Sequence, residues 1–216
     1  MIRLLKNNWL LLLIVLASCQ NKPRTSSMPF INKPDYTPEW IEKNDPSYSS
    51  IHHIPAFSFT NQNGETVTEK TVEGKIYVAD FIFTRCGSIC PKMTTNMALI
   101  QERFKNNKEV LLLSHSVTPE MDSVPVLKKY AKDKGIISGK WHLLTGNQDE
   151  IYTLARKEYY AGDTIGYYQT GNEFLHTENF ILVDKQRRIR GVYNGTLPLE
   201  AERLMDDIAT LLKEDE

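Results

Sequence analysis

The feature that most limits the fold of this chain is the run IYVADFIF at residues 76–83, in which Asp80 is the only charged residue. A strand with one face in water alternates polar and apolar side chains, whereas a strand covered on both faces is apolar at nearly every position. We therefore expect residues 76–83 to form a buried strand at the centre of a sheet.

The rest of the chain alternates between the periodicities of strands and helices. Asn63 and Gly64 form a tight hairpin signal between two short alternating segments. The pattern predicts strands at 57–59, 66–68 and 76–83, a helix opened by Pro91, a strand at 110–114, a helix at 124–134 closed by Gly135, a strand at 141–144, a helix at 148–157, a hairpin of strands at 180–183 and 189–193, and a helix at 198–212. This order predicts an α/β sandwich: a central mixed sheet with parallel central strands, flanked by helices and extended by an N-terminal hairpin. Ligands of such sheets collect at the carboxyl ends of the strands.

Composition narrows the choice of partner. The 26 Lys and Arg residues are balanced by 27 Asp and Glu residues, which leaves a formal net charge of −1. No basic excess is present to neutralise phosphates, so we expect no nucleic acid partner. The three cysteines are too few for a disulfide framework, and each needs its own explanation.

The N-terminus has the pattern of an export signal. Arg3 and Lys6 precede an apolar run at residues 9–17, which is shorter than the about 20 residues of a membrane-spanning helix. The run ends in LASC, and this quartet resembles the lipobox of bacterial lipoproteins, in which the cysteine is lipidated. An ordinary signal peptide with an incidental cysteine is the alternative. We expect residues 1–18 to be a lipoprotein signal peptide, and Cys19 to anchor an extracytoplasmic protein to the periplasmic side of a membrane.

Residues 19–50 form a proline-rich tether between the predicted anchor and a predicted domain at residues 51–216. Five of the ten prolines lie in this tether, and the first glycine of the chain is Gly64. Such a segment behaves as a stiff spacer. Four of its side chains are too apolar for a purely solvated linker: Phe30, Tyr36, Trp40 and Ile41. We therefore expect the second half of the tether to lie against the domain.

Two cysteines follow the predicted central strand, at the turn into the next helix. Cys86 and Cys90 are four residues apart, a spacing that on a helical turn places their α-carbons about 6 Å from each other. At that distance the two sulfurs can form a disulfide or grip one ion, and the start of a helix favours the thiolate. Pro91, at the first helical position, has no backbone N–H that needs an acceptor. The alternative is a pair of buried apolar cysteines without chemistry.

The sequence around this pair, FIFTRCGSICP at residues 81–91, resembles the F-x-F-T-x-C-P-x-x-C-P signature of the SCO/SenC family of copper chaperones. Further blocks follow in the family's order: SVTPEMD at 116–122, WHLLTG at 141–146 and FLHTENFILVD at 174–184. The resemblance covers residues 55–212. It implies a thioredoxin-like fold that binds copper through Cys86, Cys90 and His176 and helps to assemble the copper centre of a respiratory cytochrome oxidase. Thiolates suit Cu(I), and an added imidazole makes the site competent for Cu(II).

The chain departs from the family pattern at three positions. Gly87 stands where the family usually has proline, which permits a looser loop and a different redox balance. Thr118 replaces the aspartate of the SVDPExD block, and Leu175 replaces the aspartate before the histidine. The carboxylate that the family has at the position of Thr118 therefore cannot tune the metal site of this chain.

The other histidines are weaker candidates for the third ligand. His115 ends a strand at the same edge of the sheet, which makes it the only substitute for His176 that the pattern offers. The remaining histidines, His52, His53 and His142, have no such position. The glycine-dotted segment 162–179 around His176 is expected to be a mobile loop that closes on the metal.

Three more residues near the cysteines have simpler interpretations. Met93 and Met97 have the helical spacing of core residues rather than of thioether ligands. Asp80 lies in the strand that leads to the cysteines. A buried carboxylate there either tunes the thiols or serves as a hydrogen-bonded structural group, and the pattern leaves both open.

Two functions from different classes fit these residues. The first is a copper chaperone, a metal carrier rather than an enzyme, which passes copper to an oxidase subunit or another copper protein. The second is a membrane-anchored thiol–disulfide reductase that keeps extracytoplasmic cysteines reduced. Oxidoreductases of the thioredoxin type use C-x-x-C opposite a cis-proline, whereas this chain has C-x-x-x-C and no proline between Pro125 and Pro198. The pattern favours the chaperone.

Overall fold

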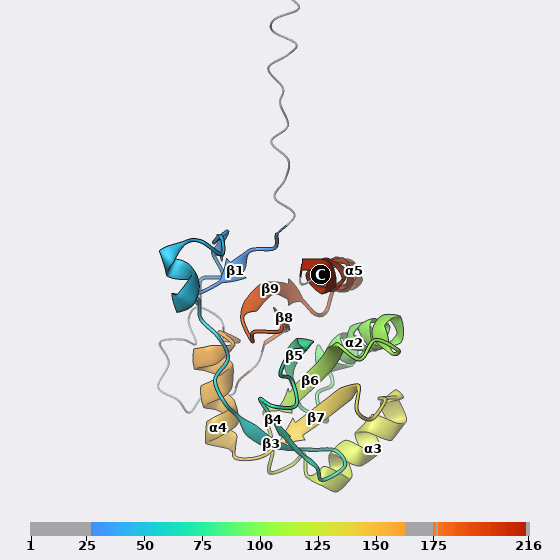
Figure 1. Ribbon diagram of the computed structural model, residues 1–216. Coiled ribbons are helices and arrows are strands. Elements are labelled where there is room, and N and C mark those ends of the chain that lie inside the picture. Colours follow the sequence, from blue (N-terminus) through green and yellow to red (C-terminus); the bar gives the residue numbers. More distant parts are fainter. Residues whose placement is uncertain (1–26, 163–174, 176, 215–216) are drawn as a thin grey trace, which may run out of the picture.

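The computed structural model of the protein describes residues 27–162, 175 and 177–214 (Figure 1). A seven-stranded sheet in the order β4-β3-β7-β6-β5-β8-β9 forms its centre. The strands are β3 (Ser58–Asn61), β4 (Thr66–Thr68), β5 (Ile76–Ile82), β6 (Val110–Ser116), β7 (Trp141–Thr145), β8 (Asn179–Val183) and β9 (Ile189–Asn194). The helices are α2 (Cys90–Phe104), α3 (Val124–Lys134), α4 (Gln148–Thr153) and α5 (Pro198–Glu214). The predicted order of strands and helices is confirmed.

The sheet is mixed. β5, β6 and β7 run parallel at its centre, while β3 runs antiparallel to β7 and β8 antiparallel to β5. In the central register, Ile76 lies opposite Val110 and Ile82 lies opposite Ser116. The three parallel strands therefore end at one side of the sheet, which we name the carboxyl edge, and begin at the opposite side, the amino edge.

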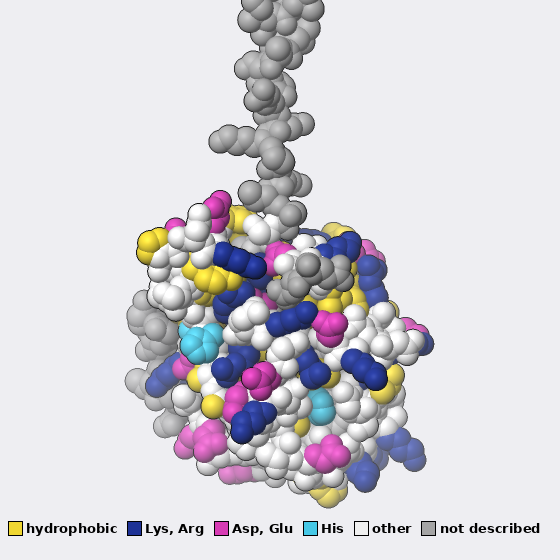
Figure 2. Space-filling model, viewed as in Figure 1, with side chains coloured by type: hydrophobic (Ala, Val, Ile, Leu, Met, Phe, Trp, Pro, Cys, Tyr) yellow, Lys and Arg dark blue, Asp and Glu magenta, His cyan; other side chains and the backbone are white. Residues whose placement is uncertain are grey.

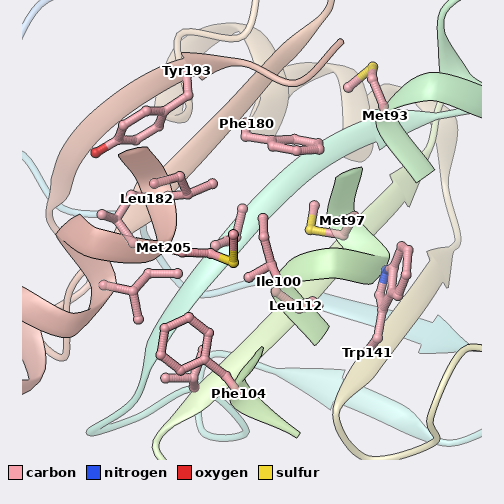
Figure 3. Packing of buried hydrophobic residues seen from close by; sticks show 14 of the residues in the cluster. Met93, Met97, Ile100, Phe104, Leu112, Trp141, Phe180, Leu182, Tyr193 and Met205 are labelled. Carbon is pink, nitrogen blue, oxygen red and sulfur yellow. The ribbon is translucent and has the colours of Figure 1, made fainter. Parts of the chain in front are cut away.

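Side-chain alternation along β5 divides the core into two clusters. Val78 and Ile82 face the cluster that α2, α3 and α5 cover, whereas Phe81 and its same-face neighbours meet α4. Met93 and Met97 of α2 lie in the first cluster, fully buried (Figure 3). Every residue of β5 is buried, which confirms the prediction from the apolar run.

The segment before the domain packs partly against it. β1 (Phe30–Ile31) and β2 (Pro38–Glu39) pair as a small antiparallel sheet, and the 3-10 turn η1 (Pro46–Ser50) follows. Phe30 is buried beneath the guanidinium of Arg190, which lies 4.4 Å from the centre of the ring. The Tyr36 hydroxyl donates to the backbone carbonyl of Tyr160. Trp40, in contrast, is 61% exposed, so the expectation that the second half of the tether lies against the domain is wrong for this side chain.

Two helix boundaries differ from the predicted ones. α2 begins at Cys90, so Pro91 is its second residue. α4 ends at Thr153 and continues as a π-helical turn, η2 (Leu154–Glu158). In this wider turn the Tyr159 amide donates to the Leu154 carbonyl, five residues back.

Candidate metal centre

The two cysteines lie at the carboxyl edge, on the loop of residues 83–89 that joins β5 to α2 and on the first turn of α2. We name residues 83–89 the dithiol loop. Both cysteines are free thiols, with 9% of Cys86 and 3% of Cys90 exposed. The backbone N–H of Cys90 donates to the Cys86 sulfur over 3.4 Å. The two side chains are therefore neighbours, with Cys86 the outer one.

A cradle of backbone amides surrounds the Cys86 sulfur. Ile89, the residue before α2, makes no side-chain cap, so the first amides of the helix need another acceptor. Burial raises the pKa of the Cys86 thiol, but hydrogen bonds from the Cys90 thiol and from the amides of Cys90, Ser88 and Ile89 outweigh burial, and the pKa lies below its ordinary value. The amide cradle (Ser88, Ile89 and Cys90) thus stabilises a thiolate, the form that binds metal.

Cys90 is different. The pKa of its thiol is raised to about 12: burial contributes most of the rise, the neighbouring Cys86 and Asp80 add to it, and a hydrogen bond from the Phe83 backbone offsets part of it. The Cys86 thiol therefore ionises more readily than an ordinary cysteine, whereas the Cys90 thiol holds its proton at neutral pH.

Asp80 lies on the same face of β5 as Val78 and Ile82, the face on which the cysteines pack. Its Oδ1 accepts a hydrogen bond from the Ser114 hydroxyl at 2.5 Å, and that hydroxyl oxygen accepts one from Trp141 Nε1 at 2.8 Å. Burial raises the pKa of Asp80 to about 7, although the bond from Ser114 lowers it. Both interpretations that the sequence left open apply, since Asp80 is hydrogen-bonded and also raises the pKa of Cys90.

Asp122 joins the dithiol loop to the loop that follows β6. Its carboxylate is completely buried. Oδ1 accepts from the Thr84 hydroxyl at 2.5 Å, and Oδ2 accepts from the Thr84 amide at 3.2 Å, from Ser116 Oγ at 2.6 Å and from Thr118 Oγ1 at 3.2 Å. Thr84 lies two residues before Cys86, so this carboxylate fixes the point at which the dithiol loop leaves β5.

Sequence reasoning did not single out Asp122. Its only signal was its place at the end of the SVTPEMD block, because Thr84, its partner in the dithiol loop, comes next to it only in the folded chain. Thr118, which stands where the family has an aspartate, lies beside Asp122. Its hydroxyl donates a hydrogen bond to Asp122, where an aspartate would add a second carboxylate.

His115 is wrong as a substitute ligand. Its ring is fully buried and stacks on Phe81 with 5.1 Å between ring centres, and Phe59 and Tyr159 also contact it, each at 5.7 Å. Those aromatic residues belong to the cluster beneath α4, whereas the cysteines belong to the cluster beneath α2. Burial lowers the pKa of His115 to about 4. The strand ends at the expected edge, but the side chain points to the other face of the sheet.

His176 lies outside the described residues, as does most of the segment 162–179 that we predicted to be a mobile loop. Its two chain neighbours are described and both are buried, Leu175 at 4% and Thr177 at 8% exposure. They lie four and two residues before the start of β8, which begins beside β5 at the carboxyl edge. Among the described residues, no group of three His, Cys, Asp or Glu side chains is placed to hold a metal ion.

Gly87 occupies open space in the dithiol loop. A Cβ built at this position would meet no atom within 4 Å, and its φ is not in the left-handed region. The loop therefore does not require glycine here, and a Cβ such as that of alanine has room.

The fold and the site together define a class: an α/β protein of thioredoxin-like architecture, with a pair of thiols where a central strand meets a helix. Comparison with known proteins gives the particular family. The SCO1/SenC family model matches residues 46–213, and the chain belongs to this family.

Three relatives illustrate the similarity. The SCO1 protein homolog of Bacillus subtilis (strain 168) is 33% identical over 159 residues, which are 73% of this chain and 81% of that protein. The crystal structure of a SCO1/SenC family lipoprotein from Bacillus anthracis has a TM-score of 0.63 at 30% identity and covers 74% of this chain and 95% of that one. The structure of Arabidopsis thaliana ScoI with copper bound has a TM-score of 0.58 at 27% identity and covers 74% and 98%. The predicted family and fold are confirmed.

Proposed function

We propose that this protein binds copper through Cys86, Cys90 and His176 and delivers it to the copper centre of a respiratory cytochrome oxidase. The observation that carries the proposal is the thiol pair at the carboxyl edge, whose outer sulfur lies in the amide cradle. A copper-bound relative, ScoI of Arabidopsis thaliana, has the same fold and supports the choice of metal.

The donor set fits copper as the cargo. Two soft thiolates prefer Cu(I), and an imidazole adds a donor that stabilises Cu(II). Binding to both sulfurs displaces the proton that Cys90 holds, because the thiolate is the ligand form. Two thiolates around Cu(I) leave one surplus negative charge, which the amide cradle offsets in part.

Delivery then proceeds by exchange of ligands. Thiolates of the recipient displace Cys86 and Cys90 in turn, so that the ion is never released into water. Cys86, the more exposed of the two, is the first that an incoming thiolate can replace. The recipient is an oxidase subunit or another copper protein.

One observation favours a thiol–disulfide reductase as the second candidate. A thiol with a lowered pKa beside a buried thiol with a raised pKa is the arrangement of an attacking and a resolving cysteine. On this alternative, Cys86 attacks a disulfide of the client, and Cys90 then releases the reduced client while the Cys86–Cys90 disulfide forms. Two thiol hydrogens move from this protein to the client's two sulfurs.

Copper titration of the reduced protein without oxygen tests the proposal. We expect one bound ion per chain, and an intense sulfur-to-copper charge-transfer band for Cu(II). Cys86→Ser and Cys90→Ser should each abolish the band, whereas Ser88→Ala, a change at an exposed residue of the same loop, should keep it. Survival of the band in either cysteine variant would remove the thiol pair from the site.

We further propose that Cys19 carries a lipid and that residues 1–18 are removed, which leaves residues 19–50 as the tether of the domain at 51–216. The similar Bacillus anthracis protein, which is described as a lipoprotein, supports this location at the extracytoplasmic side of a membrane. In the parts of the chain that the structure describes, no helix has the length and apolar character needed to cross a bilayer. Mass spectrometry of the N-terminal peptide tests the lipid, which a Cys19→Ser variant should lack.

A further inference from the structure

Lysines line the amino edge of the sheet. Lys75 directly precedes β5, Lys108 lies two residues before β6, Lys140 directly precedes β7, and Lys185 follows the end of β8 by two residues. These four strands are adjacent in the order β7-β6-β5-β8. At about 4.8 Å between neighbouring strands, the four lysines form a row about 14 Å long. We name them the lysine row.

A hollow of about 460 Å³ lies along this row. Its lining includes Lys75, Lys105, Lys108 and Lys140 but no Asp or Glu. Backbone carbonyls fix two of these cations, since Lys140 Nζ donates to the carbonyls of Asn107 and Val110, and Lys75 Nζ donates to that of Lys108. Lys140 is only 6% exposed, and its burial together with the nearby charge of Lys75 lowers its pKa.

The acidic side chains near the row do not remove this excess. Glu109 is paired with Lys185 at 2.7 Å, and Glu102 is paired with Lys105. Glu73 is exposed in the loop before β5. Ile137, which is 42% exposed, lies on the rim of the hollow and adds an apolar side chain to the basic surface. Cationic side chains around an exposed apolar one are typical of surfaces that rest on lipid headgroups.

The same edge is where the described chain begins. The backbone N–H of Met28 donates to Glu214 Oε1 at 2.7 Å, so the start of the described chain lies beside the C-terminal end of α5 (Figure 1). α5 follows β9, which runs parallel to β5, and returns along the sheet to end at the amino edge. Figure 2 shows Lys and Arg side chains, in dark blue, across the middle of a face of the molecule, with Asp and Glu side chains, in magenta, among them. From Cys19 to Ser27 the chain spans at most about 30 Å.

We propose that the more exposed cations at this edge, Lys75, Lys105 and Lys108, dock the domain on the anionic headgroups of the membrane to which Cys19 is anchored, with the buried Lys140 behind them. This inference rests on the proposed anchor but not on copper binding. Docking by the amino edge directs the carboxyl edge away from the lipid. Since β5 is seven residues long, the thiol pair then stands about 20–25 Å above the docked edge, accessible to the copper domain of another membrane protein.

Chemical modification of lysines in the intact lipoprotein tests the docking. The protein is reconstituted into vesicles of phosphatidylcholine, with or without phosphatidylglycerol, and treated with an amine-acetylating reagent before peptide mass spectrometry. We expect phosphatidylglycerol to slow the modification of Lys75 and Lys108 about fivefold, the factor that one basic residue contributes at an anionic surface. Lys92 on α2 and Lys128 on α3 are the internal controls and should react equally in both vesicles. The protection should vanish near 1 M salt, where the screening length falls to about 3 Å.

A matched pair of variants sharpens the result. In the double variant Lys75→Glu and Lys108→Glu, phosphatidylglycerol should no longer protect the remaining lysines Lys105 and Lys185 from acetylation. In the double variant Lys92→Glu and Lys128→Glu, Lys105 and Lys185 should still be protected. Equal lysine reactivity in both kinds of vesicle would overturn the docking. Protection by inorganic phosphate with phosphatidylcholine vesicles would also overturn it, in favour of a site for soluble anions. If the protein does not float with either kind of vesicle in a density gradient, the anchor and the docking are both overturned. The Cu(II) charge-transfer band, measured on the same samples, tests the proposed function alone.

Discussion

The buried carboxylate of Asp122 allows a quantitative test of how the site is built. It accepts four hydrogen bonds, two of them from Thr84 in the dithiol loop. A hydrogen bond to a charged group contributes about 1.5–3 kcal/mol, and a buried donor left without an acceptor costs about 1–3 kcal/mol. The three hydroxyl donors can rotate towards other acceptors, but the Thr84 amide cannot.

Removing the carboxylate also removes the unfavourable desolvation of a buried charge, which offsets part of the loss. We therefore expect Asp122→Ala to lower the free energy of unfolding by about 3–5 kcal/mol. Asp122→Asn keeps one oxygen as an acceptor and should lose roughly half as much. Asp133→Ala, which breaks an exposed pair with Lys129, is the control and should cost no more than about 0.5 kcal/mol.

Urea unfolding followed by circular dichroism measures these differences. The rate of Cys86 alkylation in dilute buffer provides a second, local readout, because a dithiol loop released from Asp122 should expose the thiol well below the unfolding midpoint. If Asp122→Ala unfolds within about 1 kcal/mol of the wild type and alkylates at the same rate, the carboxylate does not hold the loop.

Three further predictions follow from single positions. Gly87→Ala should raise the free energy of unfolding by about 0.4–1 kcal/mol by restricting the unfolded chain, because a Cβ has room there; a loss of stability in thermal melts would show that the loop needs glycine. The folded chain holds the Asp80 proton up to a pKa of about 7, compared with 3.8 in the unfolded chain, so the contribution of Asp80 to stability falls as the pH rises through that window; Asp80→Asn should be more stable than the wild type at pH 8 by up to about 4 kcal/mol and equal to it near pH 4, and equal stabilities at pH 8 would refute the raised pKa. The folded-state pKa of His115 is about 4, compared with 6.5 in the unfolded chain, so the contribution of His115 to stability falls by up to about 3 kcal/mol as the pH drops from 6.5 to 4; in His115→Phe this contribution should be absent, and a wild-type pH profile in the variant would contradict the prediction.

The parts of the molecule that depend on local pattern were predictable. The apolar run ending at Phe83 identified the central strand, and the cysteines after it marked the carboxyl edge. Both were predictable because the burial of a strand and the start of a helix depend on residues that are neighbours in the sequence. His115 shows the limit of this reasoning. The end of its strand was placed correctly, but the face on which its side chain lies depends on the register of β6 against β5, and that register brings it next to Phe81.

Features that depend on contacts between distant segments could not be predicted. Asp122 acquires its role only when the loop after β6 meets the dithiol loop. Trp40 was expected against the domain on the basis of its apolarity, but the fold leaves 61% of it exposed. The lysine row arises from four loops that only the sheet order brings together, and no stretch of sequence contains it.

The most direct test of the central claim is copper titration of the reduced protein without oxygen, with the wild type and His176→Ala compared under the same conditions. We expect one ion per chain, with Cu(II) affinity sharply weakened in the variant, Cu(I) affinity weakened less, and the reduction potential of the thiol pair within roughly 30 mV of the wild type. If His176→Ala binds both oxidation states like the wild type yet fails to reduce client disulfides, copper delivery through Cys86, Cys90 and His176 is contradicted and the reductase takes its place.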